Sequence, residues 1–261
     1  MARAAGMLGL LSLAPMVVFA ASGASEVPLL GEEYLKDVGD YAKRIGDEAK
    51  ELFKTPLEDW NFYGSYDHGL KVYWRPVKDN KLVIVRSYTE VQLSSGELFT
   101  LLASEEGAKI LDDTTNHTDP PLATLDWKGR AEVSYSKTIP AKFPFGQRSF
   151  LKATFFDDEK QLLVSKSILR DDMPAGADGS TRAFNSFALR TRDLEPGTCS
   201  LEVLDYFDMR GWFPVWIANQ FHRDTFCQSM HKRLWKALDA RTKADPAVKM
   251  PSSVFDVLKR S

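Results

Sequence analysis

The feature that most constrains this chain is a long series of short segments in which apolar and polar residues alternate. A two-residue period is typical of a strand with one covered face, and turn residues such as Asp67-His68-Gly69 separate the segments. About nine strands are expected, at 61–65, 70–75, 81–91, 123–127, 131–139, 148–156, 162–169, 183–191 and 200–207. Because no helical pattern separates the later strands, we expect them to form an antiparallel sheet.

The period then changes to that of an α-helix. Apolar side chains recur at three- and four-residue steps from Phe213 to Ala240, and Pro214 suits the first turn of a helix because its φ is fixed. A capping box at Ser94 and Glu97 indicates one or two short helices over 98–111. The expected fold class is therefore α+β, with a long helix covering one face of the sheet.

The first 24 residues read as a targeting segment. Arg3 precedes an uncharged run, and the small residues Ser22 and Ala24 precede a plausible cleavage position, which is the layout of a secretory signal peptide. The run is shorter than the roughly 20 residues that span a bilayer. We therefore expect a protein that is secreted or held in an endomembrane lumen; the alternative is an uncleaved segment that anchors it to a membrane.

The rest of the chain divides into three parts. Residues 25–57 form an N-terminal region in which an amphipathic helix is expected from Glu32 to Phe53. Residues 58–243 contain the sheet and the long helix, and residues 244–261 are expected to be a C-terminal tail.

Three residues could be modified if the chain enters the secretory route. Asn116 begins an Asn-His-Thr tripeptide, which is either an N-glycosylation acceptor or a chance sequence in a polar loop. Cys199 and Cys227 are the only cysteines, and two alternatives stay open for them: a disulfide, or two separate buried thiols.

Charge and motifs argue against several functions. The 34 basic residues balance 36 acidic ones, for a net charge of -2, which argues against nucleic acid as a partner. The sequence contains no nucleophile elbow, no phosphate-binding glycine loop and no His-Glu-x-x-His pattern. His222 and His231 are interpreted as solvent-facing residues of the long helix. We therefore expect no catalytic residue, no metal and no cofactor.

Isolated polar residues interrupt the apolar strands. Lys152, Asn185 and Asp205 are candidates to line a ligand cavity, because a buried polar group needs a partner and a ligand can provide one. The alternatives are that Lys152 and Asp205 are exposed on the other face of the sheet, and that Asn185 bonds to the backbone.

Two segments resemble the StAR-related lipid-transfer (START) domains. The segment Asp208–Gln220 reads DMRGWFPVWIANQ, and is similar to the family pattern of an acidic strand end, Gly-Trp-hydrophobic-Pro and then Asn. The segment Gly146–Phe150 is similar to Gly-Pro-Arg-Asp-Phe, with Gln147 and Ser149 replacing Pro and Asp. The resemblance covers roughly Trp60 to Leu238. It implies a helix-grip fold of the Bet v 1-like superfamily, in which a curved sheet wraps around the C-terminal helix.

The resemblance also implies a function. One lipid would occupy a tunnel between sheet and helix, and the protein, as a monomeric carrier, would touch membranes transiently. The expected ligand-binding residues are Tyr135, Lys152, Thr154, Asn185, Asp205 and Phe221. The expected lid and membrane contacts are Phe143, Phe145, Trp212 and Phe213. The lipid is expected to be a phospholipid or another amphipathic lipid. A sterol is less favoured, because the positions charged in sterol-type members correspond to Tyr135 and Thr154.

Two other functions stay open. The same superfamily includes aromatase/cyclase-type enzymes, for which Tyr135, Lys152 and Asp205 would be the acid and base candidates. A secreted interaction protein with a filled core and no ligand is the third interpretation. It predicts bulky residues throughout the enclosed layer and no stabilisation by lipids.

Overall fold

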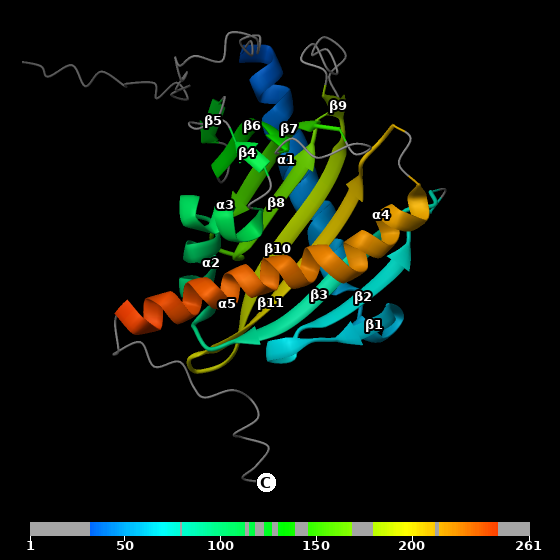
Figure 1. The fold of residues 1–261 in the computed structure, drawn as a ribbon. Helices are drawn as coiled ribbons and strands as arrows, with labels where there is room; N and C mark the ends of the chain where they lie inside the picture. Colours follow the sequence, from blue (N-terminus) through cyan, green and yellow to red (C-terminus); the bar gives the residue numbers. More distant parts are fainter. Residues whose placement is uncertain are drawn as a thin grey trace, which may run out of the picture.

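The computed structural model describes residues 32–78, 80–112, 115–117, 123–126, 130–138, 146–168, 180–211 and 214–244. Its strands form one curved sheet in the order β1-β2-β3-β11-β10-β8-β7-β6-β4, antiparallel at every step (Figure 1). β5 pairs with β6, and β9 runs parallel to β7. The strands are β1 (Asn61–Ser65), β2 (Lys71–Pro76), β3 (Val83–Val91), β4 (Thr115–His117), β5 (Ala123–Asp126), β6 (Arg130–Thr138), β7 (Arg148–Asp157), β8 (Leu162–Ser167), β9 (Thr181–Arg182), β10 (Phe184–Glu195) and β11 (Thr198–Asp208).

Helices cover both faces of this sheet, whereas the sequence predicted cover on one. They are α1 (Glu32–Lys54), α2 (Ser95–Leu102), α3 (Glu105–Leu111), α4 (Val215–Phe221) and α5 (Cys227–Ala244). α1 crosses one face, here called the outer face, and α4 and α5 cross the other, the inner face (Figure 1). The predicted α+β class is confirmed, and so is the capping box, in which Ser94 Oγ accepts from the Glu97 backbone N–H at 3.3 Å.

α1 packs on the outer face through a stripe of apolar residues three or four positions apart. The stripe consists of Val38, Ala42, Ile45, Ala49 and Phe53, all buried. It meets side chains of β6, β7 and β8, among them Leu151, Ala153 and Leu162. Because α1 covers the outer face, the residues of β7 that point to this face are apolar and pack against the helix. Each Å² of apolar surface that this packing removes from water stabilises the fold by roughly 25 cal/mol.

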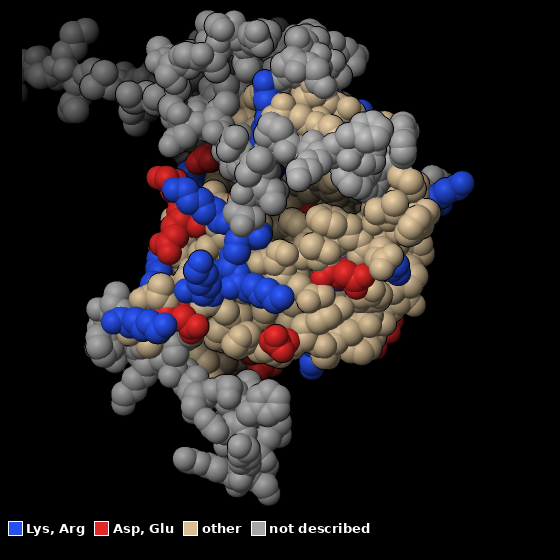
Figure 2. Space-filling model, viewed as in Figure 1, with Lys and Arg blue, Asp and Glu red and all other residues tan. Residues whose placement is uncertain are grey.

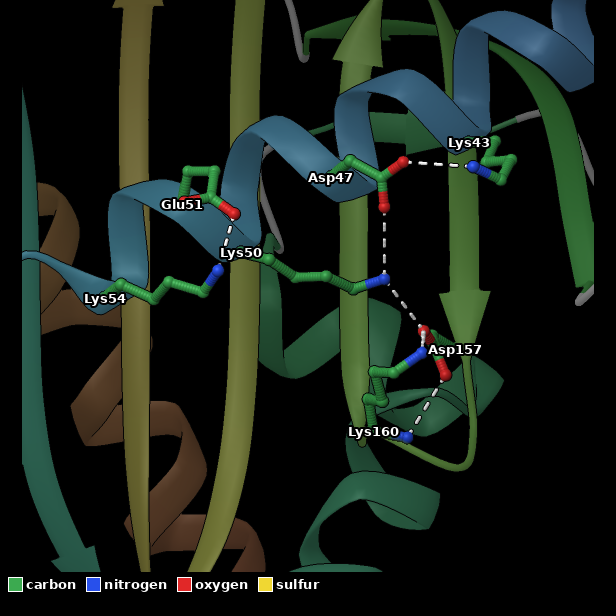
Figure 3. Close-up of polar contacts among 7 residues, drawn as sticks. All are labelled: Lys43, Asp47, Lys50, Glu51, Lys54, Asp157 and Lys160. Carbon is green, nitrogen blue, oxygen red and sulfur yellow. Dashed lines mark hydrogen bonds and ion pairs between the residues drawn. The ribbon is translucent and has the colours of Figure 1, made fainter.

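Charged residues line the solvent side of α1 (Figure 3). Lys50 Nζ lies 3.4 Å from Asp47 and 3.1 Å from Asp157, the last residue of β7, so it joins the helix to the sheet. Lys43 also contacts Asp47 at 3.1 Å, and this lysine holds the pKa of the Asp47 carboxyl below its usual range. The Lys43–Asp47 pair is solvent-exposed and so adds well under about 1 kcal/mol, whereas Lys50 and Asp157 are partly buried.

A buried group of three charges holds the C-terminal end of α1. Glu202 accepts from Arg190 Nη2 at 2.7 Å and from Arg86 Nε at 3.0 Å. The same guanidinium groups donate to backbone carbonyls at the helix end: Arg190 to Phe53 at 2.9 Å and Arg86 to Thr55 at 2.6 Å. The last carbonyls of a helix have no partner within it, so the two arginines satisfy them from the sheet.

The long C-terminal helix expected from Phe213 to Ala240 is confirmed over Val215–Ala244, but it is not regular throughout. A π-helical turn, His222–Phe226, separates α4 from α5. The buried positions run Ala218, His222, Cys227, in steps of four and then five, because the π turn inserts one residue. The insertion turns His222 inward and leaves Phe221 exposed. The interpretation of His222 and His231 as solvent-facing is therefore wrong, since they are only 4% and 3% exposed.

The two cysteines are free and buried, so the disulfide alternative is wrong. Cys199 packs with the residues of α2 and α5, whereas Cys227 packs with Leu70 and Val72 of the β1–β2 region. Burial raises the pKa of each thiol to about 12. No helix among the described residues is long and apolar enough to span a membrane.

Candidate functional site

The inner face of the sheet can be assigned residue by residue from the strand pairing. Phe156, Leu163, Phe187 and Val203 pack with Met230 and other residues of α5, so they point toward the helix. Side chains two positions apart on a strand share a face. The inner face therefore also carries the polar residues Ser134, Ser136, Lys152, Thr154, Ser165, Ser167, Asn185 and Asp205.

A polar cluster joins the inner face to the π turn of the C-terminal helix. Asp205 accepts from Asn185 Nδ2 at 3.0 Å through Oδ1, and its Oδ2 lies 2.6 Å from Nε2 of His222. The Asn185 backbone N–H donates to Ser167 Oγ at 2.9 Å. All four side chains are buried. The carboxylate of Asp205 is thus hydrogen-bonded to Asn185 through Oδ1, whereas Oδ2 lies against His222 Nε2 and neither of these two buried atoms has a hydrogen-bond partner among the described residues.

Lys152 lies at the centre of β7 on the same face. It stands directly opposite Ser134 of β6 and Ser167 of β8 in the strand register. Its Nζ lies 5.1 Å from the centre of the Phe150 ring. Burial lowers the pKa of the Lys152 ammonium group, and the carboxylates of Asp112 and Asp205 partly oppose this shift.

The structure brings together some of the candidate ligand-binding residues and separates others. Lys152, Thr154, Asn185 and Asp205 share the inner face, where Thr154 Oγ1 bonds to Ser165 Oγ at 2.9 Å. Tyr135 lies on the outer face, against the cluster formed by α1 and β7, so its expected place among the ligand-binding residues is wrong. The outer face is as apolar as the inner one because α1 covers it, so the alternation of residues does not show which face is which. Tyr135 points to the outer face.

Phe221 is also misplaced by the sequence argument. It is 44% exposed at the end of α4, because the π turn that follows shifts the inward stripe to His222. His222 and the serines of β6 and β8 are the site residues that sequence reasoning missed. The serines could have been found from the sequence, because they alternate with the apolar outer-face residues of their strands. His222 could not, because no sequence pattern predicts a π-helical turn.

Polar side chains also fix the start of the C-terminal helix. Arg148 Nε donates to the Met209 carbonyl at 2.8 Å, which ties β7 to the end of β11. Asn219 bridges to the β2–β3 turn, donating to the Lys81 carbonyl at 2.9 Å and accepting from the Val83 N–H at 3.1 Å. Between these anchors Arg210 adopts a positive φ of 52°. These contacts give structural roles to the Arg and Asn of the two START-like segments.

Several expected site residues lie outside the described residues. They are Phe143, Phe145, Trp212 and Phe213, together with the targeting segment 1–24. Asn116 lies in β4, but its side chain is outside the described part.

The chemistry of the described site does not match a cysteine nucleophile. Cys227 follows the π turn. Burial, together with the negative charge of Asp205, raises the pKa of its thiol to about 12. It is a neutral thiol at pH 7, whereas the thiolate is the reactive form. In the described ranges no group of three or more His, Cys, Asp or Glu side chains could hold a metal ion.

Comparison with known proteins shows the fold. No family model and no curated protein sequence matches the chain. The structure is similar to human StAR-related lipid transfer protein 5, with a TM-score of 0.62 and 16% identity over 78% of this chain and 98% of that one. It is similar to human STARD10, with a TM-score of 0.57 and 16% identity over 87% and 89% of the two chains. It is also similar to the lipid transfer and protein localization domain of human StarD13, with a TM-score of 0.53 and 21% identity over 73% and 93%. The chain therefore has the helix-grip fold of START domains.

Proposed function

We propose that the protein binds one amphipathic lipid between the inner face of the sheet and the C-terminal helix, and carries it between membranes. One observation supports this most: the layer beside α5 is apolar, yet it contains a polar row centred on Lys152 that the described residues do not fully match. Structural likeness to lipid transfer proteins supports the same function. Each buried CH₂ of an acyl chain would contribute about 0.8 kcal/mol.

Native mass spectrometry of the full chain, purified from a secretory host, tests this proposal. We expect a stoichiometric adduct that organic extraction releases as a lipid. A protein that is purified empty and gains no thermal stability from a panel of phospholipids and single-chain lipids would contradict it.

The exposed apolar residues of α4 favour this helix as a membrane contact. Trp216 is 68% exposed, and Val215 and Phe221 are also exposed. In Figure 2 the surface over α4 is mostly free of charged residues, whereas Lys and Arg gather over α3 and the C-terminal half of α5. Aromatic side chains are favoured at the membrane–water interface, where an apolar ring can leave water.

Replacing Trp216 and Phe221 together by serine is expected to lower liposome binding and lipid transfer several-fold. The free energy of unfolding should change by less than about 0.5 kcal/mol, because the two side chains are exposed. Vesicle sedimentation and a fluorescent-lipid transfer assay measure the effect. Leu194→Ser is the matched control: Leu194 is 51% exposed in β10, next to the β10–β11 turn and so at the opposite end of the sheet from α4. Unchanged transfer in the double variant, or an equal loss in the control, would remove α4 from the membrane contact.

We also propose that the chain enters the secretory route. The layout of residues 1–24 and the acceptor tripeptide at Asn116 support this. Amino-terminal sequencing of the secreted protein and a mass shift on glycosidase treatment would test the two features separately. Retention of an intact amino terminus in membranes would instead favour the anchored alternative.

A further inference from the structure

Within the described part of the chain, hydrogen-bond donors that lack an acceptor lie close together at one place on the inner face. Ser134, Lys152 and Ser167 form a row across β6, β7 and β8, and Ser136 follows two residues after Ser134 on the same face. Ser167 Oγ already accepts from the Asn185 N–H, so its hydroxyl hydrogen is free to donate elsewhere. Ser136 is 1% exposed, and its hydroxyl has no hydrogen-bond partner among the residues that the structure describes.

The acceptors nearby have closer neighbours than Lys152. Asp205 accepts from Asn185 through Oδ1, and its Oδ2 lies 2.6 Å from His222 Nε2, although neither of these two atoms has a hydrogen-bond partner among the described residues. In the adjacent row, Thr154 and Ser165 bond to each other at 2.9 Å. Apart from His222, the described donors of the inner face that lack an acceptor lie in the row of Lys152 and at Ser136.

The ammonium group of Lys152 is the cation in this row. Within the described ranges, no hydrogen bond and no ion pair within 4 Å joins its Nζ to another side chain, and its nearest ring contact is the face of Phe150. The carboxylates of Asp112 and Asp205 act on it only through space. The Lys152 side chain is half-buried, and an ammonium group that has lost part of its water needs a compensating partner. An anion with several acceptor oxygens would satisfy the lysine and the serines together.

We propose that Lys152, Ser134, Ser136 and Ser167 form a subsite for the anionic group of an acyl lipid, either a carboxylate or a phosphate. This inference rests on the proposed lipid-binding function and adds the class of head group. The acyl chain would then extend along the apolar residues that pack against α5, among them Phe156 and Leu163.

Three ligands with the same oleoyl chain test the subsite: oleate, 1-oleoyl-lysophosphatidate and neutral monooleoylglycerol. Isothermal titration of the full chain should give at least about tenfold tighter binding for one or both anionic ligands, since a charge-assisted hydrogen bond contributes about 1.5–3 kcal/mol. Preference for oleate would identify a carboxylate subsite, and preference for the lysophosphatidate a phosphate subsite.

Lys152→Met should abolish this preference while leaving affinity for monooleoylglycerol within about twofold, because methionine keeps the apolar stem. Lys166→Met is the matched control, since Lys166 is in β8 on the outer face and pairs with Glu48 at 3.0 Å. Ser136→Ala removes one donor without charge, and should weaken only the anionic ligands.

The outcomes separate the two proposals. Equal or tighter binding of the neutral ligand, or a Lys152→Met variant that keeps the preference, overturns the anionic subsite and leaves lipid binding standing. Failure of all three ligands to bind contradicts the subsite and the proposed function together.

Discussion

Replacing Glu202 by alanine is expected to lower the free energy of unfolding by about 3–5 kcal/mol, the loss that follows when one partner of a buried ion pair is removed. The carboxylate contacts both Arg86 and Arg190, and all three side chains are largely buried. Without it, two guanidinium groups remain close together with no counter-charge. Their hold on the Phe53 and Thr55 carbonyls would weaken too, so α1 should loosen from the outer face.

Urea unfolding followed by tryptophan fluorescence measures this loss, with the m-value checking that unfolding stays two-state. Glu51→Ala is the control: Glu51 lies on α1 and pairs with Lys54 at 2.6 Å in solvent, so its loss should cost no more than about 0.5 kcal/mol. Glu202→Gln should fall between the two, since the amide keeps one acceptor for the arginines. A Glu202→Ala loss as small as that of Glu51→Ala would show that the three charges contribute no more than a surface pair.

Nine of the eleven described strands and the class of fold followed from the sequence because they depend on local periodicity, whereas β4 and β9, with three and two residues, are too short to show it. Alternation marked the strands of the antiparallel sheet, and the apolar stripe of α1 marked its helix within one residue at its C-terminal end. What alternation does not reveal is which of two apolar faces meets which helix. Tyr135 was assigned to the wrong side for this reason.

The site was predictable only in part. Lys152, Asn185 and Asp205 stood out as polar residues in apolar strands, and the structure places all three on the inner face. His222 did not stand out, because its burial depends on a five-residue step in the hydrogen bonding of the helix. The Arg86–Glu202–Arg190 group was missed as well, since its members come from strands β3, β11 and β10 and meet only through pairing.

The stability of the protein is expected to fall by up to about 3 kcal/mol on acidification from pH 7 to pH 4 through one buried residue, His231. Burial, with a smaller contribution from His68, lowers the pKa of His231 to about 4, against about 6.5 in an unfolded chain. Between pH 6.5 and pH 4, His231 therefore binds a proton in the unfolded state but stays mostly neutral in the folded state. The stabilisation is complete above pH 6.5, and is lost as the pH falls toward 4.

The local packing explains why the folded state excludes this proton. His231 Nε2 accepts from the indole N–H of Trp235 at 2.8 Å, and the Trp235 ring stacks on His68 with centroids 4.5 Å apart. Protonation at Nε2 would turn an acceptor into a donor that faces another donor, and would place a second cation beside His68 when that ring is charged. Both effects would loosen α5 from the β1–β2 turn.

His231→Gln isolates this contribution from the many carboxylates that also titrate in acid. The glutamine amide can accept from Trp235 but cannot bind a proton, so the difference in unfolding free energy between wild type and variant should shrink, or reverse in sign, as the pH falls from 7 to 4. Urea unfolding at half-unit pH steps measures it, and His68→Gln reports the share due to the neighbouring imidazole. Parallel stability curves for wild type and His231→Gln would show that His231 takes up its proton equally in both states, and would remove it as the acid-sensitive group.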